Sequence, residues 1–577
     1  MTHNLMNHRL LGLISLSICA VGACGETPQE NIDGCVELWS GDYAQRFVAG
    51  ETFFLPGWVA AQGCEGLSWT LLSGPEGSNA LLVEADGAAR LTPLVVGDYR
   101  FGLLDKEGAP TDATLDLEVI SPLERPFHNY NYFPSHRAGV WVGDELWVAG
   151  VYSPQIARFD AAEMSALEPV LVGQWPVALA YAEAMDLVLV ANKGSDTLGL
   201  VEVGTLRQID AIWVGDEPTN IVWDAARSRA YVALAGSGQV AVVDIQARQL
   251  LSTVDAVFDP LGLAMTPDGK TLIVASHRSG QSDFYPHDTR EIETEEDVAI
   301  IDLEALEVTG HILEVSSTIQ AIDFDEEGAL WVSATSNNIE GGLNDPESLS
   351  FVHEVFTLKP TAGVAERGVA VDLSRQPTSG GSTATIHGFG LCEGGLWVVA
   401  EGANQAVELD PADLTERRRV PVSGRPRAMA CGGGAVWIIS SNRGEVTRIA
   451  GDEVTSAQLG LTERRDDLLV DGLERFTGQG LGAGDNRSCN NCHADGLSDG
   501  QVWNAGPVES RLLSRPLRWL EGTSMIGWDG YVGSVKISGY VGGPTINDRG
   551  TTDSALAMGA YLASLMPAPP ANSFTRR

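Results

Sequence analysis

Basic residues and long apolar runs are both scarce in this chain. Its 577 residues include 37 Lys and Arg against 77 Asp and Glu, which gives a formal net charge of −40. Such an acidic surface repels nucleic acid and anionic membranes, so neither is expected as a partner. The apolar run from Leu10 to Ala20 is too short to span a bilayer. What remains is a turn-rich globular protein with 65 Gly, long enough for several domains.

Histidine and cysteine are rare too, with 10 and 8 copies, but three of them stand together as Cys489, Cys492 and His493. This C-x-x-C-H pattern is the attachment signature of a c-type haem. The two thiols join the haem vinyl groups as thioethers, and the next residue supplies the proximal iron ligand. Roughly 0.002 such patterns are expected by chance from this content of Cys and His. The sequence therefore predicts one covalently bound haem c.

The numbers of Cys pairs and His residues limit the other ligands of that metal site. Zinc usually needs four ligands, and the chain has no second C-x-x-C pair. His493 is the only His after His387, so this region offers no second imidazole. A methionine thioether is the natural sixth ligand of the iron. We predict Met525, in a Gly-rich loop, with Met566 as runner-up, whereas Met558 is expected in the core; an open iron site is the alternative.

The first residues predict export. Arg9 precedes the apolar run, which ends in Val21-Gly22-Ala23-Cys24. This ending resembles the lipobox of bacterial lipoproteins, which implies a signal peptide over residues 1–24, lipid on Cys24 and a tether over residues 25–34. The expected location is the outer membrane, facing the periplasm or the cell surface, with membrane contact only through the lipid. The alternative is a secreted protein cut after Ala23.

Four further cysteines form two local pairs, Cys35 with Cys64 and Cys392 with Cys431. Disulfides persist mainly in oxidising compartments, where c-type haem is also attached. We therefore predict two disulfide bonds, and they agree with export.

Residues 35–121 show short alternating strands separated by Gly and Pro. The phrase Trp69-Thr-Leu-Leu-Ser-Gly-Pro, followed by Gly97-Asp98-Tyr99, resembles the Ig-like and PKD-like β-sandwich modules of bacterial surface proteins. The resemblance implies a β-sandwich here, with a spacer or adhesion role and no chemistry of its own.

Residues 122–459 repeat. Pro176, Pro218 and Pro260 begin three units that are about 42 residues apart, and Leu-Trp-Val phrases mark further copies. Seven units of four short strands predict a β-propeller. The phrases resemble the seven-bladed propellers of the surface-layer and YncE-like group. The insertion from His277 to Asp297, with His277, Tyr285 and His287, is a candidate for a loop at the propeller mouth.

Residues 460–577 read as an all-α cytochrome c domain, with helices expected over 463–476 and 554–566. Tyr561-Leu-Ala-Ser-Leu resembles the terminal helix of class I cytochromes c, which crosses the first helix. The haem motif and Trp528-Asp529-Gly530 resemble the MauG and di-haem peroxidase superfamily. That family needs two C-x-x-C-H motifs and this chain has one, which argues against peroxidase action by this chain alone.

These patterns predict an exported electron-transfer protein with one haem, whose propeller docks a partner or ligand. The redox partner is expected to be a basic protein, because this chain is acidic. One alternative is an oxidoreductase, peroxidase-like or with a propeller dehydrogenase that passes electrons to the haem. Known fusions of that kind use eight-bladed propellers with a quinone or second haem, and no vicinal Cys pair or second haem motif is present. The other alternative is a surface adhesin.

Overall fold

The structure is a computed structural model, and its described residues are mostly β-strands. They are 46–55, 68–78, 82–83, 89–105, 107–125, 127, 129, 132–278, 296–337, 351–375, 385–478, 488–493, 502–504, 511–513 and 552–565. Within this part of the chain, no helix has the length and apolar character needed to cross a membrane.

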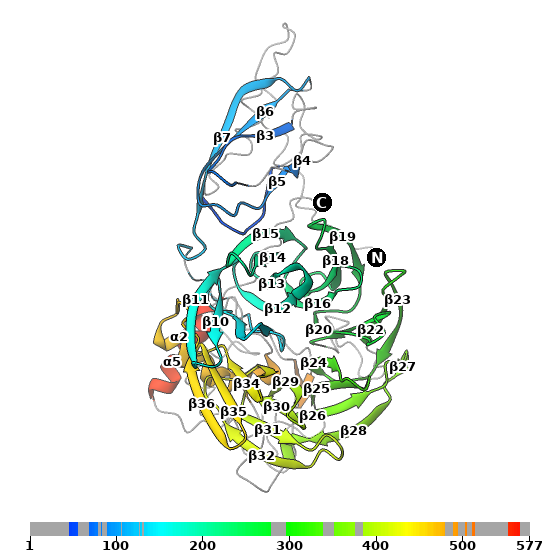
Figure 1. Ribbon diagram of the computed structural model, residues 1–577. Coiled ribbons are helices and arrows are strands. Elements are labelled where there is room, and N and C mark those ends of the chain that lie inside the picture. The colour runs from blue at the N-terminus through cyan, green and yellow to red at the C-terminus, as the bar shows by residue number, and fades with distance from the viewer. Residues whose placement is uncertain are drawn as a thin grey trace, which may run out of the picture.

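A small β-sandwich comes first and lies beside the ring of the main domain (Figure 1). One sheet has the order β1-β7-β6-β3 and the other β2-β5-β4. Their core holds Trp69, Tyr99 and Phe101, each at most 1% exposed. Alternate residues of β6 point inward, as expected of strands that bury one face. The strands are β1 (Arg46–Val48), β2 (Phe53–Leu55), β3 (Ser68–Ser73), β4 (Leu82–Val83), β5 (Ala89–Leu91), β6 (Gly97–Leu104) and β7 (Pro110–Ile120).

Seven sheets of the described chain then form the blades of a β-propeller (Figure 1). The first blade is β8 (Gly139–Val142), β9 (Glu145–Ala149), β10 (Gln155–Asp160) and β11 (Ser165–Leu171). The second is β12 (Pro176–Ala182), β13 (Leu187–Asn192), β14 (Thr197–Glu202) and β15 (Arg207–Trp213), with the 3-10 turn η1 (Glu183–Met185). The third is β16 (Pro218–Asp224), β17 (Arg229–Leu234), β18 (Gln239–Asp244) and β19 (Gln249–Asp255).

The fourth blade is β20 (Pro260–Met265), β21 (Thr271–Ser276), β22 (Glu296–Asp302) and β23 (Glu307–Leu313), with β27 (Gly363–Val364) added at its edge. The fifth blade is β24 (Thr318–Phe324), β25 (Leu330–Asn337), β26 (Phe351–Leu358) and β28 (Arg367–Asp372), with the 3-10 turn η3 (Leu373–Arg375). The sixth is β29 (Ile386–Cys392), β30 (Gly395–Ala400), β31 (Gln405–Leu409) and β32 (Glu416–Pro421). The seventh is β33 (Ala428–Gly432), β34 (Ala435–Ser440), β35 (Glu445–Ala450) and β36 (Glu453–Gln458).

The first strand of every blade lies innermost. Each of these strands contacts the next one, and β33 of the last blade contacts β8 of the first, so the ring is closed. The predicted proline repeats mark this wall, because Pro176, Pro218 and Pro260 are the first residues of β12, β16 and β20. Proline tolerates the start of a strand, where its missing N–H disrupts no ladder.

The ring closes without sharing a strand between its first and last blades. Apolar side chains of blades one, two and seven form one continuous core there. The chain after β36 then returns to the first blade, where the Thr462 N–H donates to Gln155 Oε1 at 3.0 Å. The Arg465 guanidinium lies 3.8 Å from the ring centre of Tyr152 and donates to Asn442 Oδ1 of blade seven at 2.7 Å. Residues 461–465 therefore fasten the two ends of the propeller.

Cys392 and Cys431 are joined in a disulfide that connects the innermost strands of blades six and seven. The Cα atoms are 5.6 Å apart, within the usual range for a disulfide. The other predicted pair, Cys35 with Cys64, and the predicted lipid anchor Cys24 lie outside the described residues.

Replacing Cys392 and Cys431 together by serine is expected to lower the free energy of unfolding by about 2–4 kcal/mol. The bridge closes a loop between residues that are 39 apart in sequence, and its loss frees that loop in the unfolded chain. Urea unfolding with and without reductant measures the effect. If reductant lowers the stability of the wild type no more than that of the double variant, this bridge does not stabilise the fold.

The described C-terminal segments are partly helical and partly β. They are α2 (Asp467–Thr477), α3 (Cys489–Cys492), β37 (Val502–Asn504), β38 (Arg511–Leu513) and α5 (Thr552–Ser564). Because β37 and β38 pair as antiparallel strands, the expectation of an all-α domain is wrong for this part. Figure 1 shows α2 and α5 together beside the first and last blades.

The first helix begins later than predicted. The Asp466 side chain caps it by accepting the Leu469 N–H at 2.9 Å, because the residues before it fasten the ring instead. On this helix Leu468 is 50% exposed, whereas Leu473 and Phe476 are buried. Likewise α5 ends at Ser564, two residues before the predicted end at Met566.

The two helices cross at Gly472 of α2. A Cβ atom there would overlap the carbonyl oxygen of Ala557 and the Cβ of Tyr561. Phe476, one turn later, packs against the Tyr561 ring with the ring centres 5.3 Å apart. Close approach of the two helices therefore depends on this glycine.

Substitution of Gly472 by alanine is expected to destabilise the crossing by about 1–3 kcal/mol, because the added methyl forces the helices apart. Helix propensity alone predicts the opposite sign, since Ala favours a helix over Gly by about 1 kcal/mol. Thermal unfolding monitored by helical circular dichroism distinguishes the two. The exposed Leu468→Ala serves as the control on the same helix, and a more stable Gly472→Ala protein contradicts the crossing.

Candidate functional site

The ends of strands from different blades meet at one end of the central channel. The innermost strands begin there and the second strands end there, as the pairing of Pro176 with Asn192 and of Pro260 with Ser276 shows. Loop residues next to these ends therefore converge on the channel axis. We call this set the channel mouth: Lys193, Glu217, Asp259, His277, Thr385, Glu401 and Arg427.

A buried charged triad lies on one side of the channel mouth. The Arg427 guanidinium donates to both carboxylate oxygens of Glu401, at 2.7 and 3.1 Å, and His387 Nε2 lies 2.9 Å from Glu401 Oε2. The Glu401 side chain is only 2% exposed. Arg427 also stacks 3.6 Å from the ring centre of Phe133. Blades six and seven and the segment that enters the ring thus share one network.

This triad fixes the charge of its members. Burial alone raises the pKa of Glu401, but Arg427 and His387 outweigh it and hold that pKa at about 2. Burial lowers the pKa of His387 to about 4, with Arg427 acting in the same direction and Glu401 opposing it. At neutral pH the network therefore holds a carboxylate, a guanidinium and a neutral imidazole.

The opposite side of the channel mouth carries two further ion pairs. Lys193 Nζ lies 3.5 Å from Glu217 Oε2 and 4.4 Å from the centre of the Tyr132 ring, and the Tyr132 hydroxyl donates to Glu217 at 2.5 Å. Asp259 pairs with Arg278 and lies 3.8 Å from His277 Nδ1. The channel mouth is therefore lined by buried charges of both signs.

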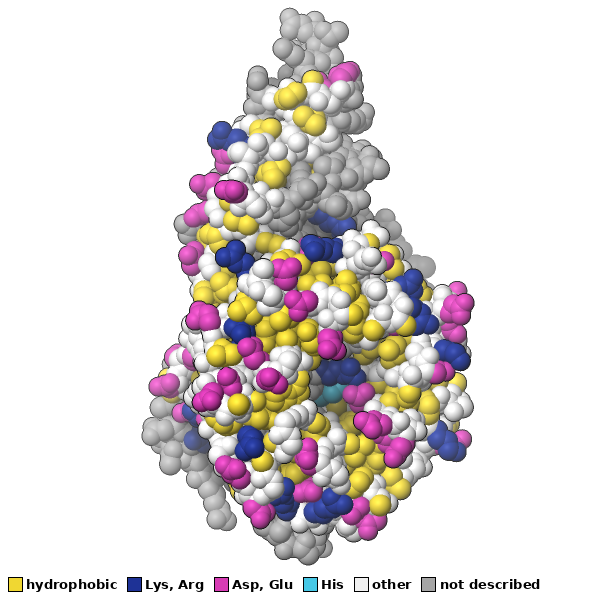
Figure 2. All heavy atoms as spheres, in the orientation of Figure 1, with side chains coloured by type: hydrophobic (Ala, Val, Ile, Leu, Met, Phe, Trp, Pro, Cys, Tyr) yellow, Lys and Arg dark blue, Asp and Glu magenta, His cyan; other side chains and the backbone are white. Residues whose placement is uncertain are grey.

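Arg137 reaches across the central channel. Arg137 of the first blade donates to the Leu263 carbonyl at 3.2 Å and pairs with Asp323 at 2.9 Å, so it reaches blades four and five. Its Nε also donates to His136 Nε2 at 3.3 Å. Figure 2 shows basic and histidine side chains in the hollow at the centre of the ring.

The C-x-x-C-H motif forms a short helical turn at the channel mouth. Cys489 and Cys492 are its first and last residues, and His493 follows directly, its N–H donating to the Cys489 carbonyl at 3.0 Å. The Ser488 N–H donates to Asn491 Oδ1 at 2.8 Å and stabilises the start of the turn. The spacing on one turn is the one that two thioether bonds to a haem require.

This turn is bound to the propeller through Thr385. The Asn491 amide donates to Thr385 Oγ1 at 3.0 Å, and the Ser488 and Thr385 hydroxyls are 3.1 Å apart. The Thr385 N–H in turn donates to Nε2 of the buried His353 at 3.3 Å. Thr385 precedes the innermost strand β29, so the haem motif lies directly over the channel wall.

An apolar cluster continues from the propeller under the C-terminal helices. It contains Trp175, whose ring contacts those of Phe127, Tyr132 and Tyr152 at 5.5–5.6 Å, together with Phe476 and Tyr561 of the helices. Cys489 and Met558 are partly buried against the same cluster. One thiol of the haem motif therefore lies at the junction between the propeller and both helices.

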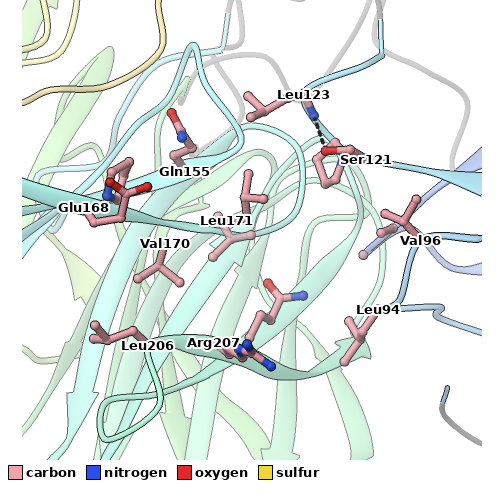
Figure 3. A pocket seen from close by; sticks show the side chains of 16 residues that line it. Leu94, Val96, Ser121, Leu123, Gln155, Glu168, Val170, Leu171, Leu206 and Arg207 are labelled. Carbon is pink, nitrogen blue, oxygen red and sulfur yellow. Dashed lines mark hydrogen bonds between the residues drawn. The ribbon is translucent and has the colours of Figure 1, made fainter. Parts of the chain in front are cut away.

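A second hollow lies where the sandwich meets blades one and two (Figure 3). This cleft measures about 450 Å³ and is lined by apolar side chains, among them Leu94, Val96, Leu171 and Leu206. Glu168 and Arg207 are the charged residues on its walls. It offers an apolar surface but no cluster of titratable groups, so the channel mouth is the stronger candidate for chemistry.

Several predicted site residues have no described position. They are Cys24, Cys35, Cys64, Tyr285, His287, Met525 and Met566. Of the insertion, His277 is 5% exposed at the channel mouth, and the buried Asp297 accepts the backbone N–H of Val315. Among the described residues, no three His, Cys, Asp or Glu side chains converge as a metal site.

Sequence reasoning missed Thr385, Glu401 and Arg427 of the channel mouth. Each lies next to the start of an innermost strand or the end of a second strand. Aligning the repeats strand by strand would have placed them at one end of the ring, although not in contact with one another.

Residues 159–342 match the YNCE-like β-propeller family. The matched segment runs from β10 of the first blade into the fifth blade of the ring. No curated protein matches the chain.

Solved structures similar to this chain include a chain of Kuenenia stuttgartiensis hydrazine synthase, at 18% identity and TM-score 0.43, over 59% of this chain and 97% of that one. Virginiamycin B lyase from Staphylococcus aureus is 12% identical with a TM-score of 0.38, over 54% and 93% of the two chains. A chain of the mitotic checkpoint complex is 11% identical with a TM-score of 0.39, over 58% and 88%. Likenesses of this size say nothing of the function.

Proposed function

We propose that this protein is an exported c-type cytochrome that transfers electrons from a single haem held at the mouth of its YNCE-like propeller. The observation that carries the proposal is the C-x-x-C-H turn, which is docked on Thr385 of the channel wall. Cys489 and Cys492 would hold the haem covalently and His493 would be the proximal iron ligand. Bound there, the haem supplies an iron that accepts and returns one electron.

The residues around the turn suit such a group. Two Cys one helical turn apart with His next in sequence match the attachment chemistry, and Cys489 faces a cluster of aromatic and apolar side chains. An apolar surround limits water access to a haem. The crossing of α2 and α5 at Gly472 also agrees with the implied likeness to class I cytochromes, in which the first and last helices cross.

The distal ligand and the partner complete the proposal. Met525 would be the sixth ligand, with Met566 as runner-up, and thioether sulfur favours the reduced iron. With a net charge of −40, the protein would attract a basic redox partner over long distances at low salt. Cys24 would carry the lipid that keeps it at the outer membrane.

Optical spectra of the purified protein, oxidised and reduced, test this function. Covalent haem that resists extraction, with an absorption band from methionine–iron charge transfer that vanishes in Met525→Ala, is the expected result. Absence of covalent haem from protein matured in a host that attaches haem c overturns the proposal.

A second candidate is an oxidoreductase whose substrate binds at the channel mouth. The buried Glu401, Arg427 and His387 network and the Lys193–Glu217 pair favour it, because polar groups that converge in a protected hollow are typical of binding sites. Carbon monoxide separates the two: ready binding to the reduced wild type indicates an open iron site and this second function.

A further inference from the structure

Arg425 is a partly buried cation beside the channel mouth, three residues before β33. Its Nη1 donates to the main-chain carbonyls of Glu401 and Gly402, at 3.1 and 2.9 Å. Its Nε is buried and has no hydrogen-bond partner among the described residues. No carboxylate of the described chain lies within ion-pair distance of it either, whereas Arg427, two residues later, is paired with Glu401 at 2.7 Å.

A buried guanidinium without an anion is costly, since its hydration is lost and carbonyl dipoles replace only part of it. Burial accordingly lowers the pKa of Arg425, against the weaker opposing effects of Glu401 and Glu474. Backbone geometry holds the residue in place, because its φ of +59° is fixed by the N–H donating to Asn404 Oδ1 at 3.0 Å. An anion from outside the chain would satisfy both the charge and the idle N–H.

The position of Arg425 points to the haem motif. Its guanidinium lies against Gly478, the residue that ends α2, so closely that an added Cβ there would overlap Nη2. Through Glu401, whose N–H donates to the Thr385 carbonyl at 2.9 Å, it is connected to the residue that binds the haem turn. A haem fixed at Cys489 and Cys492 by its vinyl edge carries its two propionate carboxylates on another part of the ring.

We propose that Arg425 of the propeller is the ion-pair partner of a haem propionate, so that the haem is shared between the propeller and the C-terminal segment. The inference rests on the proposed function. Guanidinium and carboxylate form short, charge-assisted hydrogen bonds, and the idle Nε together with Nη2 offers the two parallel donors that such a pair uses. Arg425 is thus a positioning residue and not an axial ligand.

The first test is the midpoint potential of the haem-loaded full chain. A positive charge beside the haem favours the reduced iron, so Arg425→Gln is expected to shift the reduction equilibrium about tenfold toward the oxidised form, which is 59 mV lower for one electron. Arg425→Lys keeps the charge and should recover most of the shift. Arg443→Gln is the matched control, because Arg443 is 41% exposed and already paired with Glu474 and Asp471 on α2.

The second test compares thermal stability with and without haem. In the full chain carrying haem, Arg425→Gln is expected to lower Tm, because a propionate loses its partner. In a Cys489→Ser, Cys492→Ser background the same change removes an unpaired buried charge and is expected to leave Tm equal or higher. An unchanged potential, or the same loss of Tm in both backgrounds, overturns the proposal while haem remains attached. A wild type without haem refutes the proposed function itself.

Discussion

Replacing Cys489 and Cys492 together by serine is expected to remove all covalently bound haem. Serine hydroxyls do not form thioether bonds, and the chain has no second C-x-x-C pair to take their place. The haem spectrum after denaturing extraction, and the mass of the intact chain, measure the loss directly. Covalent haem that remains in this double variant would contradict the proposed function.

The matched control makes the same chemical change elsewhere. Cys392→Ser with Cys431→Ser removes two sulfurs from the disulfide of blades six and seven, remote from the haem turn in sequence. This variant is expected to be less stable but fully loaded with haem. Equal loss of haem from both double variants would mean that the fold, and not the attachment site, had failed.

The loss of haem should also loosen the C-terminal segment. Cys489 packs against the cluster that α2 and α5 share with the propeller, so a bound haem adds apolar surface at that junction. Proteolysis of the serine variant is therefore expected to cut the chain between the helices faster than in the wild type. The propeller, whose seven blades close before residue 459, should remain intact.

The propeller could be predicted because its pattern is local and repeated. Pro176 and Pro218 begin innermost strands at the positions that the repeat gives them, and apolar residues follow at spacings that the strands bury. The bridge between Cys392 and Cys431 could be predicted for the same reason, since both occupy matching places in adjacent repeats.

The channel mouth could not be predicted because its contacts depend on ring closure. Glu401 and Arg427 are in different blades, and only the curvature of the ring brings them within 2.7 Å. The start of α2 was missed for a related reason: Arg465 fits a helical pattern but binds Asn442 of blade seven instead. Tertiary contacts override local preference at such ends.

Substitution of Glu401 by glutamine is expected to lower the free energy of unfolding by about 3–5 kcal/mol at pH 7. Glutamine keeps the shape of the side chain but removes the carboxylate that pairs with the buried Arg427, and both guanidinium hydrogen bonds lose their charged acceptor. Urea unfolding followed by Trp fluorescence measures it. Asp116→Asn is the control, because its pair with Arg100 is more than half exposed and should matter little.

The stability difference between wild type and Glu401→Gln should decrease at acidic pH. The folded pKa of Glu401, about 2, lies below its ordinary value of 4.5, so its contribution is complete above pH 4.5 and is lost as the pH falls toward 2. His387, at about 4 against 6.5, adds stability that is lost as the pH falls from 6.5 through 4. The gap between wild type and Glu401→Gln should therefore narrow below pH 4.5.

A double variant without the charges of Glu401 and Arg427 distinguishes two causes of the lost stability. One is the lost attraction between the two ions, and the other is the cost of burying Arg427 without this carboxylate. In Glu401→Leu with Arg427→Met neither charge of this pair is left without the other, so stability is expected to recover part of what Glu401→Gln loses. If the double variant is instead less stable than the single one by several kcal/mol, the network stabilises the ring chiefly through its hydrogen bonds. The main chain of Glu401 also accepts a hydrogen bond from Arg425 and donates one to the Thr385 carbonyl. Haem loading of each variant therefore shows whether the same network positions the haem turn.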